Sequence, residues 1–247
     1  MTEAICMQNM LSLTRSCIDD YGMIKARDRI AVGVSGGKDS LALLVLLAEM
    51  RRFYPEPYEV QAITLDLGYD EMDFTPIKEL CEKINVPYTV KETNIKHVVF
   101  DIKNDPNPCS LCAKMRRGAL HGKAQELGCN KVALGHHFDD AIETFMLSLI
   151  YEGRISSFRP VTYLSRADLT VIRPMLYIHE RTIANFVRRQ ELPIVHNPCT
   201  ADKNTKREDV KQLLYELEGR YPDLKKHIFG GLQRSPLPGW NKDDPLG

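Results

Sequence analysis

The chain has 247 residues, 43% of them hydrophobic and 27% charged, a composition that excludes collagen-like, coiled-coil and disordered proteins and predicts one or two globular domains. Lys plus Arg and Asp plus Glu each number 33, so a nucleic-acid partner would have to be bound by local basic patches rather than by net charge. The longest apolar stretch, residues 41–48, is about half of a membrane span, and the N-terminus lacks the layout of a secretion signal, so we expect a cytoplasmic protein that crosses no membrane.

Helices and strands are expected to alternate along the first 153 residues. Apolar residues at helical spacing predict a leading helix over residues 3–20. Short β-branched runs predict the strands that follow, and apolar or amphipathic segments predict the helices between them. The expected order is a strand at 29–34, a helix at 41–52, a strand at 60–66, a helix at 71–84, a strand at 88–91, a helix at 111–127, a strand at 131–134 and a helix at 139–150. This alternation predicts an α/β fold with a parallel sheet flanked by helices.

The pattern changes after Gly153. Residues 160–164 and 169–172 are expected to pair as a hairpin, and helices are expected at about 179–190, 202–218 and 223–232. The end of the chain carries several prolines and glycines and is expected to be a loose tail. We therefore divide the chain into an N-terminal helix (1–28), an α/β core (29–153), a smaller, mostly helical C-terminal extension (154–234) and a tail (235–247).

A glycine-rich turn, Ser35-Gly36-Gly37-Lys38-Asp39-Ser40, joins the first strand to the next helix. Exposed N–H groups at the helix N-terminus, together with glycines that allow close approach, make such a turn suitable for binding phosphate. The turn matches neither the Walker pattern nor the dinucleotide pattern G-x-G-x-x-G. The alternative without a ligand is a tight turn in which Asp39 or Ser40 caps the helix.

A second polar turn, residues 134–140, also joins a strand to a helix. Ligands of open α/β sheets bind at the carboxyl ends of strands, and adjacent carboxylates suit Mg²⁺. The alternative is that Asp139 caps the helix while Asp140 and Glu143 favour its first turn. Asp66, at the end of the second strand, is a further candidate for contact near a nucleoside.

The seven cysteines are an odd number, and without a secretion signal a disulfide framework is not expected. Cys109 and Cys112 form a C-x-x-C pair at the start of a helix, a position that favours the thiolate. Such a pair serves as half of a zinc site, as a redox dithiol or as iron–sulfur ligands. Cys199, in Asn197-Pro198-Cys199, is the best third cysteine, and three thiolates without a fourth suggest a cluster with one open iron.

Five motifs resemble, in the same order, those of the TtcA-like tRNA thiolation enzymes, which belong to the PP-loop ATP pyrophosphatases. They are S-G-G-K-D-S, P-C-S-L-C-x-K-M-R-R-G, L-G-H-H-x-D-D-x-x-E-T, I-R-P-M and N-P-C. The resemblance covers about residues 25–230 and implies the adenine nucleotide alpha hydrolase-like fold. It also implies an enzyme that uses ATP to adenylate O2 of a cytidine, at position 32 of the anticodon loop. Sulfide bound to an iron–sulfur cluster then replaces AMP.

The resemblance assigns roles to particular residues. Expected ATP-binding residues are Ser35, Gly36, Gly37, Lys38, Asp39, Ser40, Asp66, Gly135 and Asp140. Asp140 would hold Mg²⁺, Asp39 would cap its helix or aid the metal, and Arg116 would neutralise developing phosphate charge, which makes these three the expected catalytic residues. Relatives often carry lysine at the position of Arg116, and arginine keeps the charge but cannot shuttle a proton. A 4Fe-4S cluster is expected on Cys109, Cys112 and Cys199.

The expected partner is tRNA, with sulfur supplied by a cysteine desulfurase or as free sulfide, and a homodimer is left open. Phosphate contacts are expected from four basic clusters: Lys114/Arg116/Arg117, Arg188/Arg189, Lys203/Lys206/Arg207 and Lys225/Lys226. Three other enzymes stay open: a PP-loop enzyme that thiolates another tRNA nucleotide, a zinc version with persulfide on Cys199, and a ligase that joins an amine to a nucleobase. A module that binds phosphate without catalysis is the alternative from another class.

Overall fold

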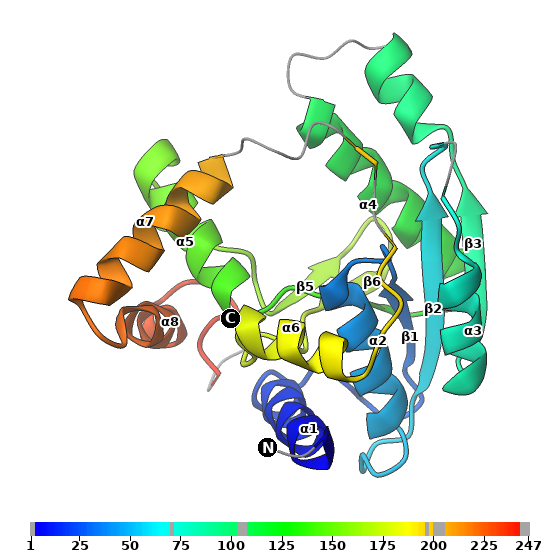
Figure 1. The fold of residues 1–247 in the computed structure, drawn as a ribbon, viewed down its shortest axis with the longest axis horizontal. Coiled ribbons are helices and arrows are strands. Elements are labelled where there is room, and N and C mark those ends of the chain that lie inside the picture. The colour runs from blue at the N-terminus through cyan, green and yellow to red at the C-terminus, as the bar shows by residue number, and fades with distance from the viewer. Residues whose placement is uncertain (1–2, 70–71, 103–107, 196–197, 200–205, 243–247) are drawn as a thin grey trace.

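The computed structural model describes residues 3–69, 72–102, 108–195, 198–199 and 206–242 (Figure 1). Within them lies a six-stranded sheet in the order β3-β2-β1-β4-β6-β5. The strands are β1 (Arg29–Gly33), β2 (Glu59–Asp66), β3 (Tyr88–Glu92), β4 (Lys131–Ala133), β5 (Val161–Leu164) and β6 (Leu169–Ile172). All neighbours are parallel except β5 and β6, which are antiparallel. The predicted α/β class, with a mostly parallel sheet, is confirmed.

The helices follow the predicted order. They are α1 (Glu3–Asp20), α2 (Lys38–Met50), α3 (Thr75–Lys83), α4 (Pro108–Glu126), α5 (Phe138–Glu152), α6 (Glu180–Arg189), α7 (Lys206–Arg220) and α8 (Leu224–Arg234). A π-helical turn, η1 (His97–Ile102), was not predicted, since its run of branched and aromatic residues has no helical period. Because α4 begins three residues earlier than expected, at Pro108, both Cys109 and Cys112 lie in its first turns.

Side chains alternate between the two faces of β1 and so build two cores. Ile30 and Val32 face the larger core, which α1 and α2 cover, whereas Ala31 faces a smaller core with Leu120 and Ala124 of α4. Helix α2 is buried on almost every side, as its uninterrupted apolar sequence requires. No helix in the described part of the chain is long and apolar enough to cross a membrane.

The predicted hairpin of β5 and β6 is confirmed, and it belongs to the main sheet. β6 pairs in parallel with β4, with Val132 opposite Val171. The sheet therefore continues across the boundary that we placed at Gly153. The division of the chain into segments stays a prediction. The hairpin of β5 and β6, which we assigned to the C-terminal extension, belongs to the sheet of the α/β core.

The expectation of a loose tail from residue 235 is wrong for its first half. Trp240 is 1% exposed, with its ring centre 5.6 Å from that of Phe229 and 6.5 Å from that of Phe158. The Tyr21 hydroxyl donates a hydrogen bond to the Trp240 carbonyl at 3.3 Å. Proline and glycine content indicates irregular backbone, but it does not show whether a large side chain fills a gap in the core.

We expect Trp240→Ala to lower the free energy of unfolding by about 3–5 kcal/mol, because a large buried ring is lost near the end of the chain. Urea unfolding followed by circular dichroism measures this, since Trp240 is the only tryptophan and its fluorescence is lost in the variant. Phe53→Ala is the control, because that ring is 50% exposed, and its cost should stay below about 1 kcal/mol. Equal costs for both variants would contradict the core role of Trp240.

Candidate functional site at the carboxyl edge of the sheet

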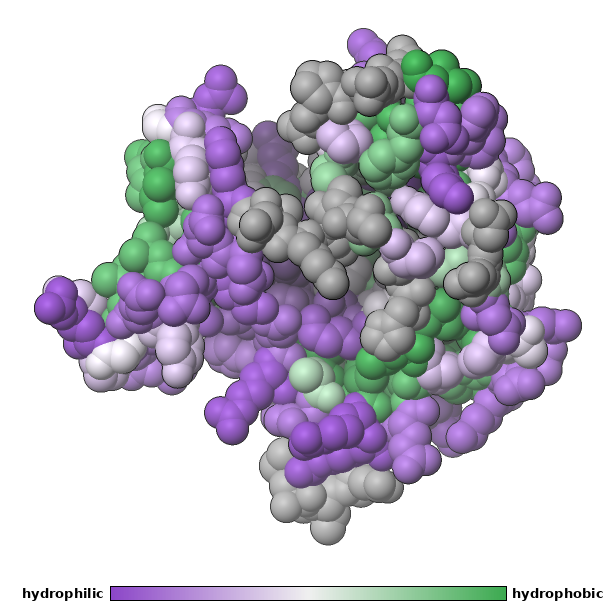
Figure 2. All heavy atoms as spheres, turned by 45° about the horizontal axis from the view of Figure 1, so that its top comes forward, coloured by the Kyte–Doolittle hydropathy of each residue, from purple (hydrophilic) through white to green (hydrophobic). Residues whose placement is uncertain are grey.

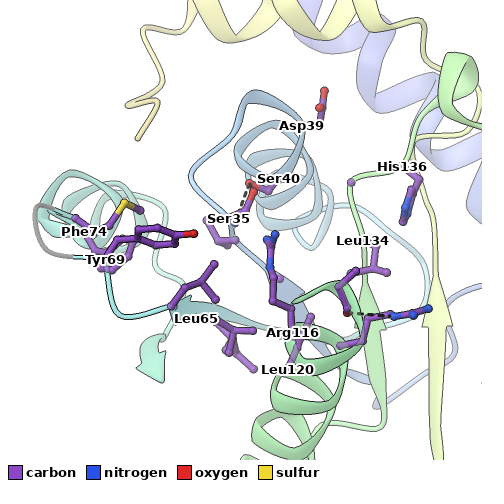
Figure 3. A pocket seen from close by; sticks show the side chains of 18 of the residues that line it. Ser35, Asp39, Ser40, Leu65, Tyr69, Phe74, Arg116, Leu120, Leu134 and His136 are labelled. Atoms are coloured by element: carbon purple, nitrogen blue, oxygen red, sulfur yellow. Dashed lines mark hydrogen bonds between the residues drawn. The ribbon is translucent and has the colours of Figure 1, made fainter. Parts of the chain in front are cut away.

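A cavity of about 430 Å³ lies at the carboxyl ends of β1, β2 and β4 (Figure 3). Ligands of open parallel sheets bind at this edge. Of the predicted ATP-binding and catalytic residues, those that line the cavity are Ser35, Asp39, Ser40, Arg116, Gly135 and Asp140. Two turns far apart in the sequence, after β1 and after β4, therefore face one space, as the motifs predicted.

The turn after β1 leaves its helix N-terminus without a side-chain cap. Gly37 is the N-cap of α2 and makes no side-chain capping bond, so neither Asp39 nor Ser40 caps the helix as expected. The Ser40 hydroxyl instead accepts from the Ser35 amide at 3.1 Å and donates to the Gly37 carbonyl at 2.9 Å. These hydrogen bonds fix the conformation of the turn without using the N–H groups at the start of α2. Those N–H groups can therefore donate to a bound anion.

Gly36 is held against the loop that leads to Cys199. Its carbonyl accepts a hydrogen bond from the Val195 amide at 3.0 Å. Its φ is +84°, and a Cβ there would lie 2.8 Å from Cβ of Val195, so only glycine fits. Gly135, in the turn after β4, is equally close to α2, because a Cβ would lie 3.0 Å from the Asp39 carbonyl oxygen. Close packing of backbone therefore joins three segments of the site.

Lys38 turns away from the cavity that we expected it to serve. Its ammonium group lies 3.0 Å from Asp39 Oδ2 and 3.1 Å from Glu180 at the start of α6. Glu180 also pairs with Lys211 of α7 at 2.8 Å. Burial raises the pKa of Glu180, but the hydrogen bonds from Lys211 and Lys38 outweigh it and lower that pKa to about 2. These pairs tie the phosphate turn to the C-terminal helices.

Asp140 takes part in a capping box at the start of α5. The His137 side chain accepts from the Asp140 amide, and Asp140 Oδ2 accepts from the His137 amide at 3.0 Å. Its other oxygen, Oδ1, accepts from Arg207 of α7 at 3.2 Å, and Arg207 also reaches Glu143 at 3.0 Å. Sequence reasoning placed Arg207 among RNA contacts and missed this pairing, which depends on how α7 packs on α5.

Asp139 has a structural role rather than the capping role that we considered. Its carboxylate accepts from the Glu180 amide at 2.8 Å and from the Lys225 ammonium group at 3.0 Å. Burial raises its pKa, but these two contacts lower it below the usual value. Asp139 therefore links α5 to α6 and α8, and Lys225, another expected RNA contact, is paired within the protein.

Asp39 and Asp140 flank one imidazole nitrogen. His137 Nε2 lies 3.9 Å from Asp39 Oδ1 and 3.4 Å from Asp140 Oδ2. Asp39 Oδ1 is buried and has no hydrogen-bond partner in the described part of the chain. Carboxylate oxygens placed this way fit Mg²⁺, which takes one or two carboxylates and completes its shell with water and phosphate. Among the described residues no group of three or more His, Cys, Asp or Glu is arranged for a metal ion.

The cysteines separate into two groups. Cys17, Cys81 and Cys129 are buried, and burial raises the pKa of each thiol, so they stay protonated and unreactive. Cys109 is exposed, and Cys112 and Cys199 are half-buried. No disulfide joins cysteines in the part of the chain that the structure describes.

The predicted cysteine trio is close enough to interact. Burial raises the pKa of the Cys112 thiol, Arg116 opposes that rise, and the sulfurs of Cys199 and Cys109 add to it. Tyr69 lines the cavity and shares a hydrogen bond with Cys199. Burial raises the pKa of Tyr69, and the hydrogen bond with Cys199 adds to that rise. The donor set therefore fits a thiolate-bound metal centre beside the cavity, although the sulfurs are not pre-arranged at metal-binding separation.

One wall of the cavity is formed by apolar residues, which the sequence analysis did not identify as part of the site. They are Ile63, Leu65, Leu67, Met72, Phe74, Leu120 and Leu134. A wall of this kind suits the faces of a purine ring. Asp66 does not line the cavity; its carboxylate accepts from the Gly68 amide at 2.9 Å and so shapes the turn that carries Tyr69. Only Leu67 and Leu134, which directly follow β2 and β4, could have been indicated by their position after a strand end.

Comparisons with known proteins agree with this site. The PP-loop domain family model ATP_bind_3 matches residues 7–218. The tRNA-cytidine(32) 2-sulfurtransferase of Pelobacter propionicus is 36% identical over 236 residues, which cover 94% of this chain and 87% of that protein. The enzyme of the same name from Geotalea daltonii is 40% identical over 87% of this chain and 86% of that protein. The solved U34-tRNA thiolase NcsA from Methanococcus maripaludis, with its [4Fe-4S] cluster, is 25% identical with a TM-score of 0.74, over 90% of this chain and 77% of that chain.

We expect Gly36→Ala to weaken ATP binding by roughly tenfold or more, since a Cβ would clash with Val195 and the left-handed backbone costs ~1–2 kcal/mol. Calorimetric titration with a non-hydrolysable ATP analogue and MgCl₂ measures the affinity. Gly122→Ala is the matched control, because a Cβ there meets nothing within 4 Å and the residue lies inside α4. Wild-type affinity in Gly36→Ala would mean that the turn does not bind phosphate in this conformation.

The pairs around Glu180 predict a pH-dependent contribution to stability. Its folded pKa of about 2 is below the ordinary value of 4.5, so the contribution is present above pH 4.5 and is lost as the pH falls toward 2. Glu180→Gln should cost about 1–3 kcal/mol of unfolding free energy at pH 6 and progressively less below pH 4.5.

Urea unfolding at a series of pH values tests this. In the control, Glu59→Gln removes an exposed pair with Arg29 and should cost less than about 1 kcal/mol. A cost for Glu180→Gln that does not change between pH 6 and pH 3 would contradict the assignment.

Proposed function

The chain belongs to the PP-loop family and, within it, to the tRNA-cytidine(32) 2-sulfurtransferases, and from this premise we propose that it thiolates C2 of cytidine 32 in tRNA at the expense of ATP. The observation that carries the proposal is the junction between Gly36 and Val195. It places the phosphate turn beside the loop of Cys199, and Tyr69 lines the cavity while bonded to that cysteine. The cavity proposed for ATP therefore has the group of thiols beside it, in contact with the lining residue Tyr69.

ATP would bind with its phosphates on the amides of the 35–40 turn and its adenine on the apolar wall. The cytidine oxygen is a poor leaving group, so O2 attacks the α-phosphorus and pyrophosphate departs. The oxygen then leaves as AMP. Arg116, which lines the cavity, would neutralise charge that develops on phosphate. Mg²⁺ held by Asp140 and Asp39 would supply further charge neutralisation at the phosphates.

The thiolates of Cys109, Cys112 and Cys199 would hold a 4Fe-4S cluster. When bound, such a cluster would supply sulfide for substitution at C2, from which AMP departs. Two observations support this donor set. The sulfurs of Cys109 and Cys199 are close enough to Cys112 to raise its pKa, and the charge of Arg116 lowers that pKa against the effect of burial. The sulfur comes from a cysteine desulfurase or from free sulfide in this proposal.

The target base must leave its stack to reach the cavity, which is easier in a loop than in a duplex. Figure 2 shows hydrophilic residues in the hollow between the lobe that holds α7 and α8 and the rest of the molecule. Arg207 and Lys225 pair with carboxylates, so the RNA contacts expected from the basic clusters are left to residues such as Lys114 and Arg117 of α4 and Arg188 of α6. A homodimer stays a prediction.

The experiment is nucleoside mass spectrometry of tRNA from cells with and without this protein. 2-Thiocytidine should disappear without it and return with the wild type and with Cys81→Ala, a buried cysteine away from the trio. Cys199→Ala should restore none and, purified anaerobically, should lack the brown colour of a cluster.

Three outcomes would count against parts of the proposal. Unchanged 2-thiocytidine in the deletion strain would overturn it. Loss of another thiolated nucleoside would move the target to another position. A colourless, active, zinc-containing wild type would replace the cluster with the zinc and persulfide version.

A further inference from the structure

Arg173 is a half-buried cation that the proposed chemistry does not use. It directly follows β6, at the same carboxyl edge as the cavity. Its guanidinium carbon lies 4.9 Å from the ring centre of Phe158. One terminal nitrogen donates to the Arg159 carbonyl at 2.6 Å and to the Thr162 hydroxyl at 3.5 Å. The Nε–H is buried and has no hydrogen-bond partner in the described residues.

Within the described part of the chain, no acidic group compensates the charge of Arg173. Burial and the neighbouring charge of Arg117 lower its pKa to about 10, and no carboxylate contributes to that shift. At neutral pH the guanidinium therefore stays charged. Arg117, on α4, lines the cavity, and its Nε–H donates to the Ala113 carbonyl of its own helix. Two cations that are close enough to repel each other, one of them half-buried, are costly unless an anion joins them.

The position of this pair separates it from the phosphate turn. β6 lies two strands from β1 in the sheet, which corresponds to about 10 Å at the usual strand spacing. The apolar wall on β2 and its following turn lies on the opposite side of β1, so ATP with its phosphates on the turn extends away from Arg173. An anion at Arg173 would belong to the second substrate.

His136 connects the pair to the cavity. It lines the cavity, and its ring centre is 4.8 Å from that of Phe158, the ring that also supports Arg173. Burial and the charge of Arg173 lower the pKa of His136 to about 4, with Asp140 opposing the shift. The imidazole is therefore neutral at physiological pH. The positive charge near His136 comes from Arg117 and Arg173.

We propose that Arg117 and Arg173 bind a backbone phosphate of the RNA substrate next to the nucleotide that is thiolated. This assignment rests on the proposed function, since it takes RNA as the second substrate. A guanidinium with unused donors matches phosphate oxygens, and such a contact fixes the register of the loop rather than reading its sequence.

Binding of a labelled anticodon stem-loop RNA with cytidine 32 to the full-length protein tests the proposal, measured by fluorescence anisotropy over a range of KCl concentrations. Arg117→Gln is the main variant, because an exposed side chain on α4 can be replaced without loss of folding. Arg173→Lys is the second variant, because lysine keeps the positive charge but lacks the planar group of N–H donors. The matched control is Arg52→Gln, an exposed arginine after α2 that pairs with Glu49 and belongs to none of the expected RNA-contact clusters.

Arg117→Gln should weaken RNA binding by about fivefold or more and reduce the slope of log affinity against log salt by about 0.7, the value for one contact to a single strand. Arg52→Gln should behave as wild type. A stem-loop with one neutral methylphosphonate beside cytidine 32 should bind the wild type more weakly and should weaken Arg117→Gln no further.

Three results would overturn the inference. Equal behaviour of Arg117→Gln and Arg52→Gln, while 2-thiocytidine formation and RNA binding persist, rejects this phosphate site alone. A loss of ATP affinity that matches the loss of RNA affinity assigns the arginines to ATP phosphates instead. Absence of specific binding of the stem-loop to the wild type rejects the RNA site and the proposed function together.

Discussion

One backbone hydrogen bond, from the Val195 amide to the Gly36 carbonyl, determines what this site can do. It is possible only because Gly36 has no side chain, since a Cβ would lie 2.8 Å from that of Val195. The bond holds the phosphate turn against the segment that precedes Cys199 in the sequence. A reaction that needs an activated oxygen and a sulfur atom in one cavity depends on this contact between residues that are far apart in the sequence.

The C-terminal helices contribute charges to the site and are not a separate attachment. Glu180 of α6, Arg207 of α7 and Lys225 of α8 each bond a side chain of the two ligand-binding turns, namely Lys38, Asp140 and Asp139 in that order. Such pairs are worth more when partly buried than on the surface. They explain why a stretch of chain without phosphate motifs is needed to shape a phosphate site.

Burial decides which cysteines and cations are available for chemistry. Cys17 and Cys81 are fully enclosed and have raised thiol pKa values, whereas the trio beside the cavity is partly exposed and lies near Arg116. Among the basic residues, several expected RNA contacts are neutralised by carboxylates. Arg173, which belonged to a motif without an assigned role, remains charged and unneutralised beside the cavity.

Patterns along the chain were enough to predict the α/β alternation, the hairpin at its end, the two polar turns and the C-x-x-C pair. These features are local, because periodicity, glycine content and C-x-x-C spacing act within a few residues of the chain. Packing of distant segments adds the closure of the core by Trp240, the pair of Arg207 with Asp140, the bond of Tyr69 with Cys199 and the electrostatic interaction of Arg117 with Arg173. Each of these depends on side chains from distant segments that meet when the sheet and helices pack, and no local pattern encodes which of them will be neighbours.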